Sequence, residues 1–236
     1  MSIVKLSKKT QNILKNFATI NKSIVISPGN KLRTMSVNRN IFASVEIAEN
    51  IPQEVAIYDL GVFLAGLSLF ENPMFNFDSD KKLEIRDETS KATTSFYYCD
   101  PEIITKPPQK DIEMPQTDVV FNLKTDTLQD LLRAASVYQV PDLCLYSGNG
   151  NINLMVCDKK NETSNTYSVP VGKLDDEDQE FCYCFKVENI RILPGDYTVS
   201  VAKNKVSHFV SFIVLALNLV QTSNAGCQIK AWVVYL

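Results

Sequence analysis

The sequence predicts an α+β protein made of two similar domains, in which antiparallel strands far outnumber helices. Apolar residues recur at helical spacing in only four short segments of the 236 residues, whereas most other segments are β-branched or alternating and end at Asn, Asp, Gly or Pro. The order of helix, several strands, short helix and several strands occurs twice, and a proline-rich stretch separates the two occurrences. We therefore expect one domain at residues 1–108 and a second at residues 109–236.

The helical segments divide evenly between the two halves. They are expected at residues 7–20, about 59–70, about 125–139 and near 187–192. LSKKTQNILKNFATI opens the first half as LKTDTLQDLLRAASV opens the second, and VAIYDLGVFLAGLSLF stands in the first where FCYCFKVENIRILPG stands in the second. This self-similarity predicts two copies of one structural unit.

Short strands are expected in the rest of the chain, because β-branched and aromatic residues dominate it and often alternate with polar ones. They are predicted at SIVIS, LRTMSV, IFASVEIA, MFNFD, KLEIRD, TTSFYYC, VVFNL, DLCLYS, NINLMVC, TYSVPV, EFCYCFKV and YTVSVAK. Near the C-terminus, FIVLALNLV and KAWVVYL compete for the closing strand. Residues 212–236 are therefore the atypical part of the second domain.

The stretch between the two halves is predicted to be a linker. DPEIITKPPQKDIEMPQTD, residues 100–118, holds four prolines and many polar residues, and proline removes a backbone donor and prevents regular structure.

Basic and acidic residues are segregated along the chain. The formal net charge is −3, yet residues 1–45 hold eight basic residues and no Asp or Glu, so the remainder carries −11. A random scatter of the acidic residues would leave such a stretch about once in two hundred trials. Solvated helix faces normally mix signs to gain i,i+4 pairs. We therefore favour a functional interpretation of the basic stretch over a merely solvated face.

The first helical segment is amphipathic, with lysines and uncharged polar residues on its polar side and no carboxylate. At 100° per residue, Leu6, Ile13, Leu14, Phe17 and Ile20 gather on one side, and Lys8, Asn12, Lys15, Thr19 and Lys22 lie opposite. Lysines and amides without carboxylates suit phosphates and carry no means of reading bases. Lys31, Arg33 and Arg39 follow in SPGNKLRTMSVNRN and could add charge nearby. The pattern predicts polyanion contact without sequence preference.

The sequence gives little support for catalysis or metal binding. The chain has no GxxxxGK[ST], GxSxG or HExxH motif and a single histidine, His208. Six cysteines show no CxxC spacing, and we expect them to be reduced, mostly buried thiols. Cys182 and Cys184 share one face of a strand, but with His208 they match no known metal spacing, so core packing is the preferred interpretation. We expect no cofactor, no metal and no enzymatic activity.

The N-terminus lacks the apolar stretch of a signal peptide, and the longest apolar run, residues 209–220, is too short to cross a bilayer. We therefore expect a cytosolic protein.

Several long segments resemble one family. KLSKKTQNILKNFATIN, from Lys5, and VAIYDLGVFLAGLSL, from Val55, are similar to corresponding segments of the DNA sliding clamps of T-even-type bacteriophages, and LQDLLRAASVYQ and LPGDYTVSV match more loosely in the same order. The resemblance implies two processivity-fold domains per chain, with two helices inside and antiparallel sheets outside. It also implies a homotrimeric ring around duplex DNA, loaded by a separate ATP-dependent clamp loader in the cytoplasm of the infected host.

The resemblance also nominates site residues. The helix lysines fall on or beside the family's first inner helix, whereas the second domain offers weaker candidates because Asp126 and Asp130 share the polar side of its helix. The complete set of DNA-binding candidates is Lys8, Lys9, Lys15, Lys22, Lys31, Arg33, Arg39, Lys124, Arg133, Lys186 and Arg191. The segment at residues 59–70 carries no basic residue.

In the wider family, partners insert a short hydrophobic peptide beneath the linker, and here the phage DNA polymerase C-terminus is the expected partner. LRTM resembles a pocket-forming stretch and nominates Met35, with Met114, Pro115, Trp232 and Tyr235 as weaker candidates. Met and aromatic residues in strands are more often plain core. Two other functions stay open: a β-rich phage structural protein that assembles through strand edges, and, more remotely, a thiol-dependent enzyme.

Overall fold

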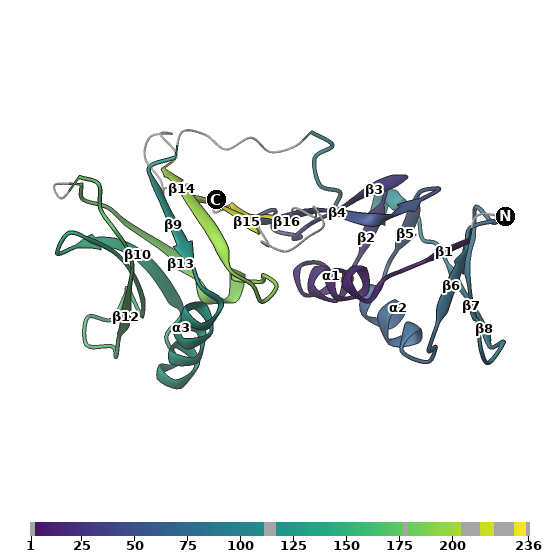
Figure 1. Ribbon diagram of the computed structural model, residues 1–236, viewed down its shortest axis with the longest axis horizontal. Helices are drawn as coiled ribbons and strands as arrows, with labels where there is room; N and C mark the ends of the chain where they lie inside the picture. The colour runs from purple at the N-terminus through teal and green to yellow at the C-terminus, as the bar shows by residue number, and fades with distance from the viewer. Residues whose placement is uncertain (1–2, 111–116, 177–178, 204–212, 220–228, 235–236) are drawn as a thin grey trace. The chain divides into compact units, whose positions relative to one another are not determined.

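The computed structural model describes residues 3–110, 117–176, 179–203, 213–219 and 229–234 (Figure 1). The chain passes from a first compact unit to a second between residues 112 and 113. We call residues 3–110 unit 1 and residues 117–219 unit 2. Both combine antiparallel sheets with few helices, which confirms the predicted α+β class.

Unit 1 contains two helices and three antiparallel groups of strands. Its elements are β1 (Ile3–Lys5), α1 (Lys8–Ile20), β2 (Ile24–Ile26), β3 (Gly29–Met35), β4 (Ile41–Ile51), β5 (Val55–Ile57), α2 (Leu60–Leu67), β6 (Pro73–Asn76), β7 (Lys82–Asp87), β8 (Thr93–Tyr97) and a 3-10 turn (Pro101–Ile103). One sheet has the order β1-β6-β7-β8, while β3 pairs with β4 and β2 pairs with β5.

The core of unit 1 forms around its two helices. α1 lies beside α2 and also contacts β3 and β4 (Figure 1). α2 joins this core to the β1-β6-β7-β8 sheet, because Phe63 packs against Phe75 and Phe96 with ring centroids 6.3 and 5.0 Å away. Edge and tilted contacts of this kind are the favoured geometries of aromatic pairs.

Unit 2 repeats the combination with one long helix. Its elements are β9 (Val119–Leu123), α3 (Thr125–Tyr138), β10 (Asp142–Gly148), β11 (Asn151–Cys157), β12 (Tyr167–Lys173), β13 (Cys182–Lys186), a 3-10 turn (Val187–Asn189), β14 (Tyr197–Lys203) and β15 (Ile213–Leu219). One sheet has the order β12-β11-β10-β13, and β14 pairs with β9 and with β15. α3 packs against β11 and β12.

The predicted helix near residues 187–192 is only the 3-10 turn. Pro194 follows closely, and a proline disfavours helical backbone at the preceding residue. Near the C-terminus the two segments that competed for one strand each form one, as β15 and as β16 (Ile229–Val234).

The prediction that all six cysteines are reduced thiols is wrong for one pair. Cys144 on β10 and Cys184 on β13 form a disulfide, with Cα atoms 4.0 Å apart. The antiparallel register places these two residues directly opposite each other. They are 40 positions apart in the sequence, so spacing motifs cannot reveal the pairing. Among the other described cysteines, Cys157 is buried, Cys99 is partly buried and Cys182 is exposed.

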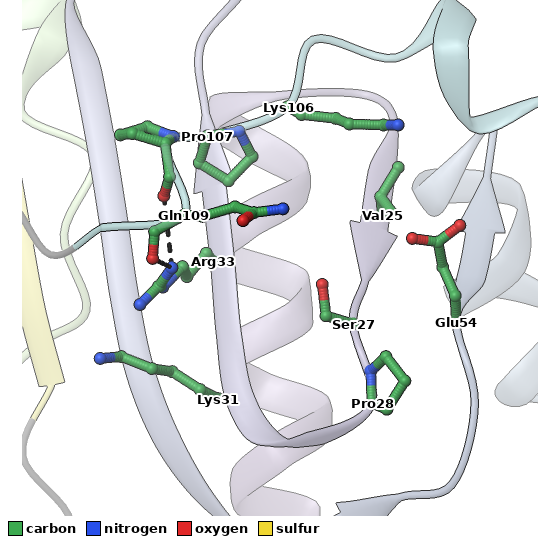
Figure 2. Close-up of a pocket in the computed structure, with 10 residues that line it drawn as sticks. Val25, Ser27, Pro28, Lys31, Arg33, Glu54, Lys106, Pro107 and Gln109 are labelled. Carbon is green, nitrogen blue, oxygen red and sulfur yellow. Dashed lines mark hydrogen bonds between the residues drawn. The ribbon is translucent and has the colours of Figure 1, made fainter.

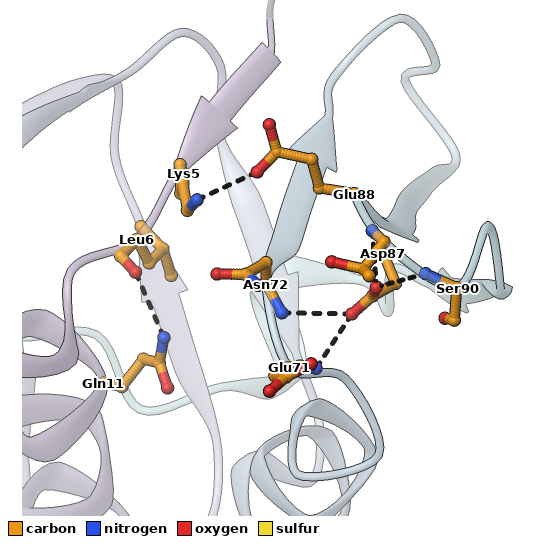
Figure 3. Close-up of polar contacts among 9 residues, drawn as sticks. Lys5, Leu6, Gln11, Glu71, Asn72, Asp87, Glu88 and Ser90 are labelled. Carbon is orange, nitrogen blue, oxygen red and sulfur yellow. Dashed lines mark hydrogen bonds and ion pairs between the residues drawn. The ribbon is translucent and has the colours of Figure 1, made fainter.

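One buried carboxylate holds two loops of unit 1 together. Asp87, at the end of β7, is 5% exposed. Its Oδ2 accepts hydrogen bonds from the backbone N–H groups of Glu71 (2.8 Å) and Asn72 (3.0 Å), and its Oδ1 from those of Thr89 and Ser90 (both 2.8 Å; Figure 3). The bonds from Ser90 and Asn72, followed by the others, hold the pKa of Asp87 well below its usual range. Asp87 therefore fastens the loop after α2 to the β7–β8 hairpin.

We predict that Asp87→Asn lowers the urea midpoint of unit 1 at neutral pH, because the amide NH2 group would face two backbone N–H donors. A carboxyl group whose pKa falls on folding stabilises the protein above its unfolded pKa, and this contribution is lost as the pH falls toward the lower folded value. The difference between wild type and Asp87→Asn should therefore be largest at neutral pH and should shrink below the ordinary value of 3.8.

Urea titrations at several pH values, followed by far-UV circular dichroism, measure this. Asp80→Asn, at an exposed carboxylate in the same unit, is the matched control and should leave the midpoint unchanged. A difference that stays constant from neutral to acidic pH would contradict the role of the Asp87 charge.

Candidate nucleic-acid interface

Helix α1 begins at a well-capped N-terminus. The Ser7 side chain accepts a hydrogen bond from the backbone N–H of Thr10 (3.2 Å), the usual N-cap arrangement. Glu49 of β4 accepts from the Ser7 backbone N–H (2.5 Å) and from the Thr10 hydroxyl (2.7 Å). Burial raises the pKa of Glu49, but these hydrogen bonds outweigh burial, so the pKa lies below its ordinary value. The carboxylate thus fixes the helix start and complements its positive dipole end.

A narrow apolar stripe fixes the rotation of α1 about its axis. Ile13, Leu14 and Phe17 are each 1% exposed, and Leu6 and Ile20 are also buried. This confirms the predicted apolar side. Burying a side chain of this size stabilises the fold by about 1.5–3 kcal/mol relative to leaving it exposed. Thr10 is also buried on this side, and the opposite side of the helix must therefore face solvent.

The lysines of this segment occupy the solvent side. Lys8, Lys9, Lys15 and Lys22 are all exposed. Lys8 and Lys15 are seven positions apart on α1, which advances about 10.5 Å over seven residues, and Lys22 follows beyond the end of the helix. Within the described part of the chain, the side chains of these lysines have no carboxylate partner and no hydrogen bond. Asn12 and Thr19 are exposed between them, so the face is cationic and amide-rich.

Lys22 lies two residues beyond the end of α1, as the expected helix at residues 7–20 implies. α1 ends at Ile20, and Asn21 follows in an extended conformation as the C-cap. The Asn21 side chain donates to the Met35 carbonyl (2.8 Å) and accepts from the Ser23 backbone N–H (3.0 Å). The Lys22 carbonyl accepts from the Leu60 N–H (2.7 Å). These bonds turn the chain toward α2 and leave the Lys22 side chain exposed.

Two other cations of the basic stretch lie at a groove under the linker. The groove has a volume of about 310 Å³, and strand residues and linker residues line it together (Figure 2). The Arg33 guanidinium donates to the Pro108 carbonyl (3.3 Å) and to the Gln109 carbonyl. Lys31 lies on the same side of β3 and also lines the groove. Arg39 is exposed separately, in the β3–β4 turn.

The groove was not predicted as a cationic site. Its lining is Val25, Ser27, Pro28, Lys31, Arg33, Glu54, Lys106, Pro107, Pro108 and Gln109. The composition of the linker indicates irregular backbone but not where the linker folds back. The contact between Arg33 and carbonyls 75 and 76 positions away shows that it covers β3.

Most candidates in unit 2 have local partners. Lys124 Nζ lies 2.7 Å from Asp196 Oδ2, and Asp196 Oδ1 also accepts from the Thr125 backbone N–H (2.9 Å). The bond from Lys124, with those from Thr125, lowers the pKa of Asp196 to about 2. Lys186 Nζ lies 2.7 Å from Asp142, whose side chain is 1% exposed.

The helix of unit 2 carries mixed charge. Arg133 on α3 is 74% exposed and lies 3.6 Å from Asp130. Asp126 lies in the first turn of the same helix. Arg191 donates from Nε to the Glu188 carbonyl (2.9 Å). These cations lie beside acidic residues and do not form a face like that of α1.

The predicted peptide-pocket residues are only partly described. Met35 is half-buried at the end of β3, on the side that carries Lys31 and Arg33. Met114, Pro115 and Tyr235 lie outside the described residues, and of Trp232 only the backbone, in β16, is described.

Among the described residues, no group of three or more His, Cys, Asp and Glu side chains is arranged to hold a metal ion. No described helix has the length and apolarity that crossing a membrane requires.

Comparisons with known proteins agree with one another. Residues 5–105 match the family described as DNA polymerase processivity factor, and residues 120–225 match gp45 sliding clamp, C terminal. A sliding clamp of Vibrio phage KVP40 is 33% identical over 88% of this chain and 94% of its own length. The sliding clamp of Enterobacteria phage T4 is 32% identical over 82% of this chain and 85% of its own length.

Solved structures share the fold at low identity. The PCNA2-PCNA3 complex from Sulfolobus tokodaii gives a TM-score of 0.68 at 15% identity, covering 99% of this chain and 98% of that one. The structure of A. fulgidus PCNA with the C-terminal region of FEN-1 gives a TM-score of 0.69 at 12% identity, covering 100% and 99%.

Proposed function

We propose that this chain, which belongs to the sliding-clamp family of DNA polymerase processivity factors, is the subunit of a ring that encircles duplex DNA and tethers a phage DNA polymerase for processive synthesis. Two family matches, one in each half, and three phage sliding clamps at 32–33% identity support the assignment. The family consists of accessory proteins, and the β-rich structural protein is not favoured.

The observation that carries the DNA-binding part of the proposal is the cationic face of α1. Its lysines are exposed, spaced along the helix and without a carboxylate partner in the described part of the chain. Lysine ammonium groups attract phosphates at long range and release counterions, and they do so without reading sequence. Such contacts suit a protein that must move along DNA without stopping at particular sequences.

The remaining parts of the proposal follow from the family. Each chain supplies two clamp domains, divided near residue 108, and three chains close head to tail into a homotrimer. A separate ATP-dependent loader opens the ring, since this sequence has no phosphate-binding loop motif. The ring works in the cytoplasm of the infected host and also serves as a platform for other replication or late-transcription proteins.

The proposed DNA contacts are unequal. Lys8, Lys9, Lys15 and Lys22 are the principal ones. Arg39, Arg133 and Arg191 remain secondary candidates because they are exposed. Lys31, Arg33, Lys124 and Lys186 come last, since the structure engages them at the linker groove or with Asp196 and Asp142.

We predict that the protein is a homotrimer at micromolar concentration, with heterologous contacts that close by rotation. Native mass spectrometry from volatile buffer at neutral pH measures this directly. Detection of monomer alone, at concentrations well above those used for DNA binding, would contradict a closed ring.

We predict that the triple change Lys8→Glu, Lys15→Glu and Lys22→Glu weakens DNA binding and leaves the fold intact, because exposed substitutions usually change stability by no more than about 0.5 kcal/mol each. Each lysine that neutralises a phosphate contributes about 0.9 to the slope of log affinity against log salt, so the slope should flatten by up to about 2.7. Linear duplex DNA with free ends, titrated from low to moderate salt, avoids topological retention.

The matched control is Lys159→Glu, Lys160→Glu and Lys173→Glu, which makes the same change of charge at exposed positions of unit 2. This variant should keep most of the wild-type salt slope. If both triple variants lose affinity equally, net charge alone explains binding. If the α1 variant stays trimeric with wild-type slope, its face is merely solvated.

For the partner peptide, we propose that a hydrophobic C-terminal segment of the phage polymerase binds beneath the linker and touches Met35. We predict that Met35→Asp abolishes binding of that peptide, because the charge would be buried without a partner. Isothermal calorimetry measures the affinity. Val37→Asp, at a position 70% exposed and two residues further along, is the control and should bind normally; unchanged affinity of Met35→Asp would remove Met35 from the pocket.

A further inference from the structure

Four cysteines of unit 2 form a chain of neighbouring sulfur atoms across three strands of one sheet. Cys144 on β10 is joined to Cys184 on β13. Cys157, at the end of β11, places its Sγ 3.7 Å from that of Cys144. Cys182, two residues before Cys184 on β13, places its Sγ 4.0 Å from that of Cys184. The contacts therefore run in the order Cys182, Cys184, Cys144, Cys157.

Strand pairing explains why these contacts form a chain and not a compact cage. Cys144 lies opposite Cys184, whereas Cys182 lies opposite Tyr146, and Cys157 lies opposite Asp142. Cys157 and Cys182 thus extend from the central pair in opposite directions along the strands. A tetrahedral metal site needs four ligands around one point, which this arrangement does not offer. In thiol–disulfide exchange, by contrast, the disulfide bond moves from one sulfur atom to its neighbour in separate steps.

Exposure changes along the chain of sulfurs. Cys182 is exposed at one end, and Cys184 is partly buried. Cys144 and Cys157 are only 2% and 5% exposed. A molecule in solution reaches the Cys182 end and is excluded from the other end.

We propose that Cys182 is a thiol–disulfide exchange site for low-molecular-weight disulfides and thiols, through which the buried Cys144–Cys184 disulfide is formed and reduced. The site extends the protein's chemistry beyond the DNA and partner contacts proposed above and does not depend on them. Its substrates are small disulfides of the glutathione type and the corresponding thiols.

Oxidation of the reduced protein takes three exchanges. The Cys182 thiolate attacks one sulfur of the small disulfide, forming a mixed disulfide and releasing one small thiolate. The Cys184 thiolate then attacks Cys182 Sγ, forming the Cys182–Cys184 bond and releasing the second small thiolate. Finally the Cys144 thiolate attacks Cys184 Sγ, forming Cys144–Cys184 and returning Cys182 to a thiolate, which takes a proton from solvent. One small disulfide is reduced to two thiols, and one protein dithiol is oxidised.

Cys157, at the buried end of the series, has surroundings that disfavour its thiolate form. Burial first, and then the Asp142 carboxylate, raises the pKa of Cys157. Since the thiolate is the nucleophile in exchange, the raised pKa makes Cys157 a poor nucleophile at neutral pH. The exchange therefore stops at Cys144–Cys184, the bond seen in the structure.

Trypsin separates the two protein disulfides that this exchange would form. Cleavage after Arg133, Lys159, Lys173 and Lys186 gives one peptide, residues 134–159, that holds Cys144 and Cys157, and another, residues 174–186, that holds Cys182 and Cys184. The Cys144–Cys184 bond links the two peptides. A mixed disulfide on Cys182, or a Cys182–Cys184 bond, stays within the second peptide.

The experiment follows oxidation of the fully reduced full-length protein by oxidised glutathione, with samples quenched by acid, alkylated, digested and analysed by mass spectrometry. In wild type, glutathione adducts on the second peptide should appear first and the linked pair afterwards. Cys182→Ser should slow the appearance of the linked pair about tenfold. Cys157→Ala, which removes the neighbour at the buried end, is the matched control and should leave the rate unchanged.

Two results would overturn the proposal. A Cys182→Ser protein that forms the linked pair at the wild-type rate would show that Cys184 reacts directly with the small disulfide. A wild-type protein that never forms the pair would show that the sulfurs do not exchange. Urea midpoints of all variants establish that they are folded, and Cys182→Ala replaces Cys182→Ser should the serine variant be destabilised.

Discussion

The burial of one apolar stripe on α1 is the constraint on which the candidate interface depends. Ile13, Leu14 and Phe17 are almost completely buried, and Glu49 holds the helix start by two hydrogen bonds. Rotation of the helix would expose these side chains and press lysine ammonium groups into the core, which is costly without a partner. The packing of the stripe therefore determines which side of α1 faces solvent. The residues on that exposed side determine what the surface can bind. The sheets supply the wall against which this orientation is fixed.

Helix α3 of unit 2 is buried on one side in the same way, but its exposed side has a different charge. Leu128, Leu131 and Ala135 bury one side of α3 as the stripe buries one side of α1. The opposite side mixes Arg133 with Asp126 and Asp130, and Lys124 before the helix is neutralised by Asp196. Packing constrains only the buried side of each helix, so the two units keep one architecture while their charge differs. All eight basic residues of the first 45 belong to unit 1, and four of them, Lys8, Lys9, Lys15 and Lys22, lie exposed on α1 or just beyond its end.

Local patterns predicted the local features and missed the pairings between distant segments. The apolar side of α1 follows from spacing alone, and all five of its predicted residues are buried. The end of that helix at Ile20 also agrees with the expected range 7–20, but the bond from the Asn21 side chain to the Met35 carbonyl 14 positions away could not be predicted. The Cys144–Cys184 disulfide and the contact of Arg33 with the linker depend on strand register and on the path of a proline-rich segment. Neither leaves a periodic signal in one sequence, since each joins residues that become neighbours only after the sheets have formed.

The chemistry of the α1 face fits the proposed sliding function better than it fits a fixed binding site. A site that holds one DNA sequence uses planar, bidentate donors such as arginine, whose geometry matches particular bases. The exposed face of α1 has no arginine, and its charges are lysines, which are compact charges on flexible stems. Each lysine can follow a phosphate as the duplex rotates past, and screening by salt keeps every contact weak. Rigid packing on one side and flexible charge on the other thus give attraction to DNA without a preferred position, and retention would come from the closed ring.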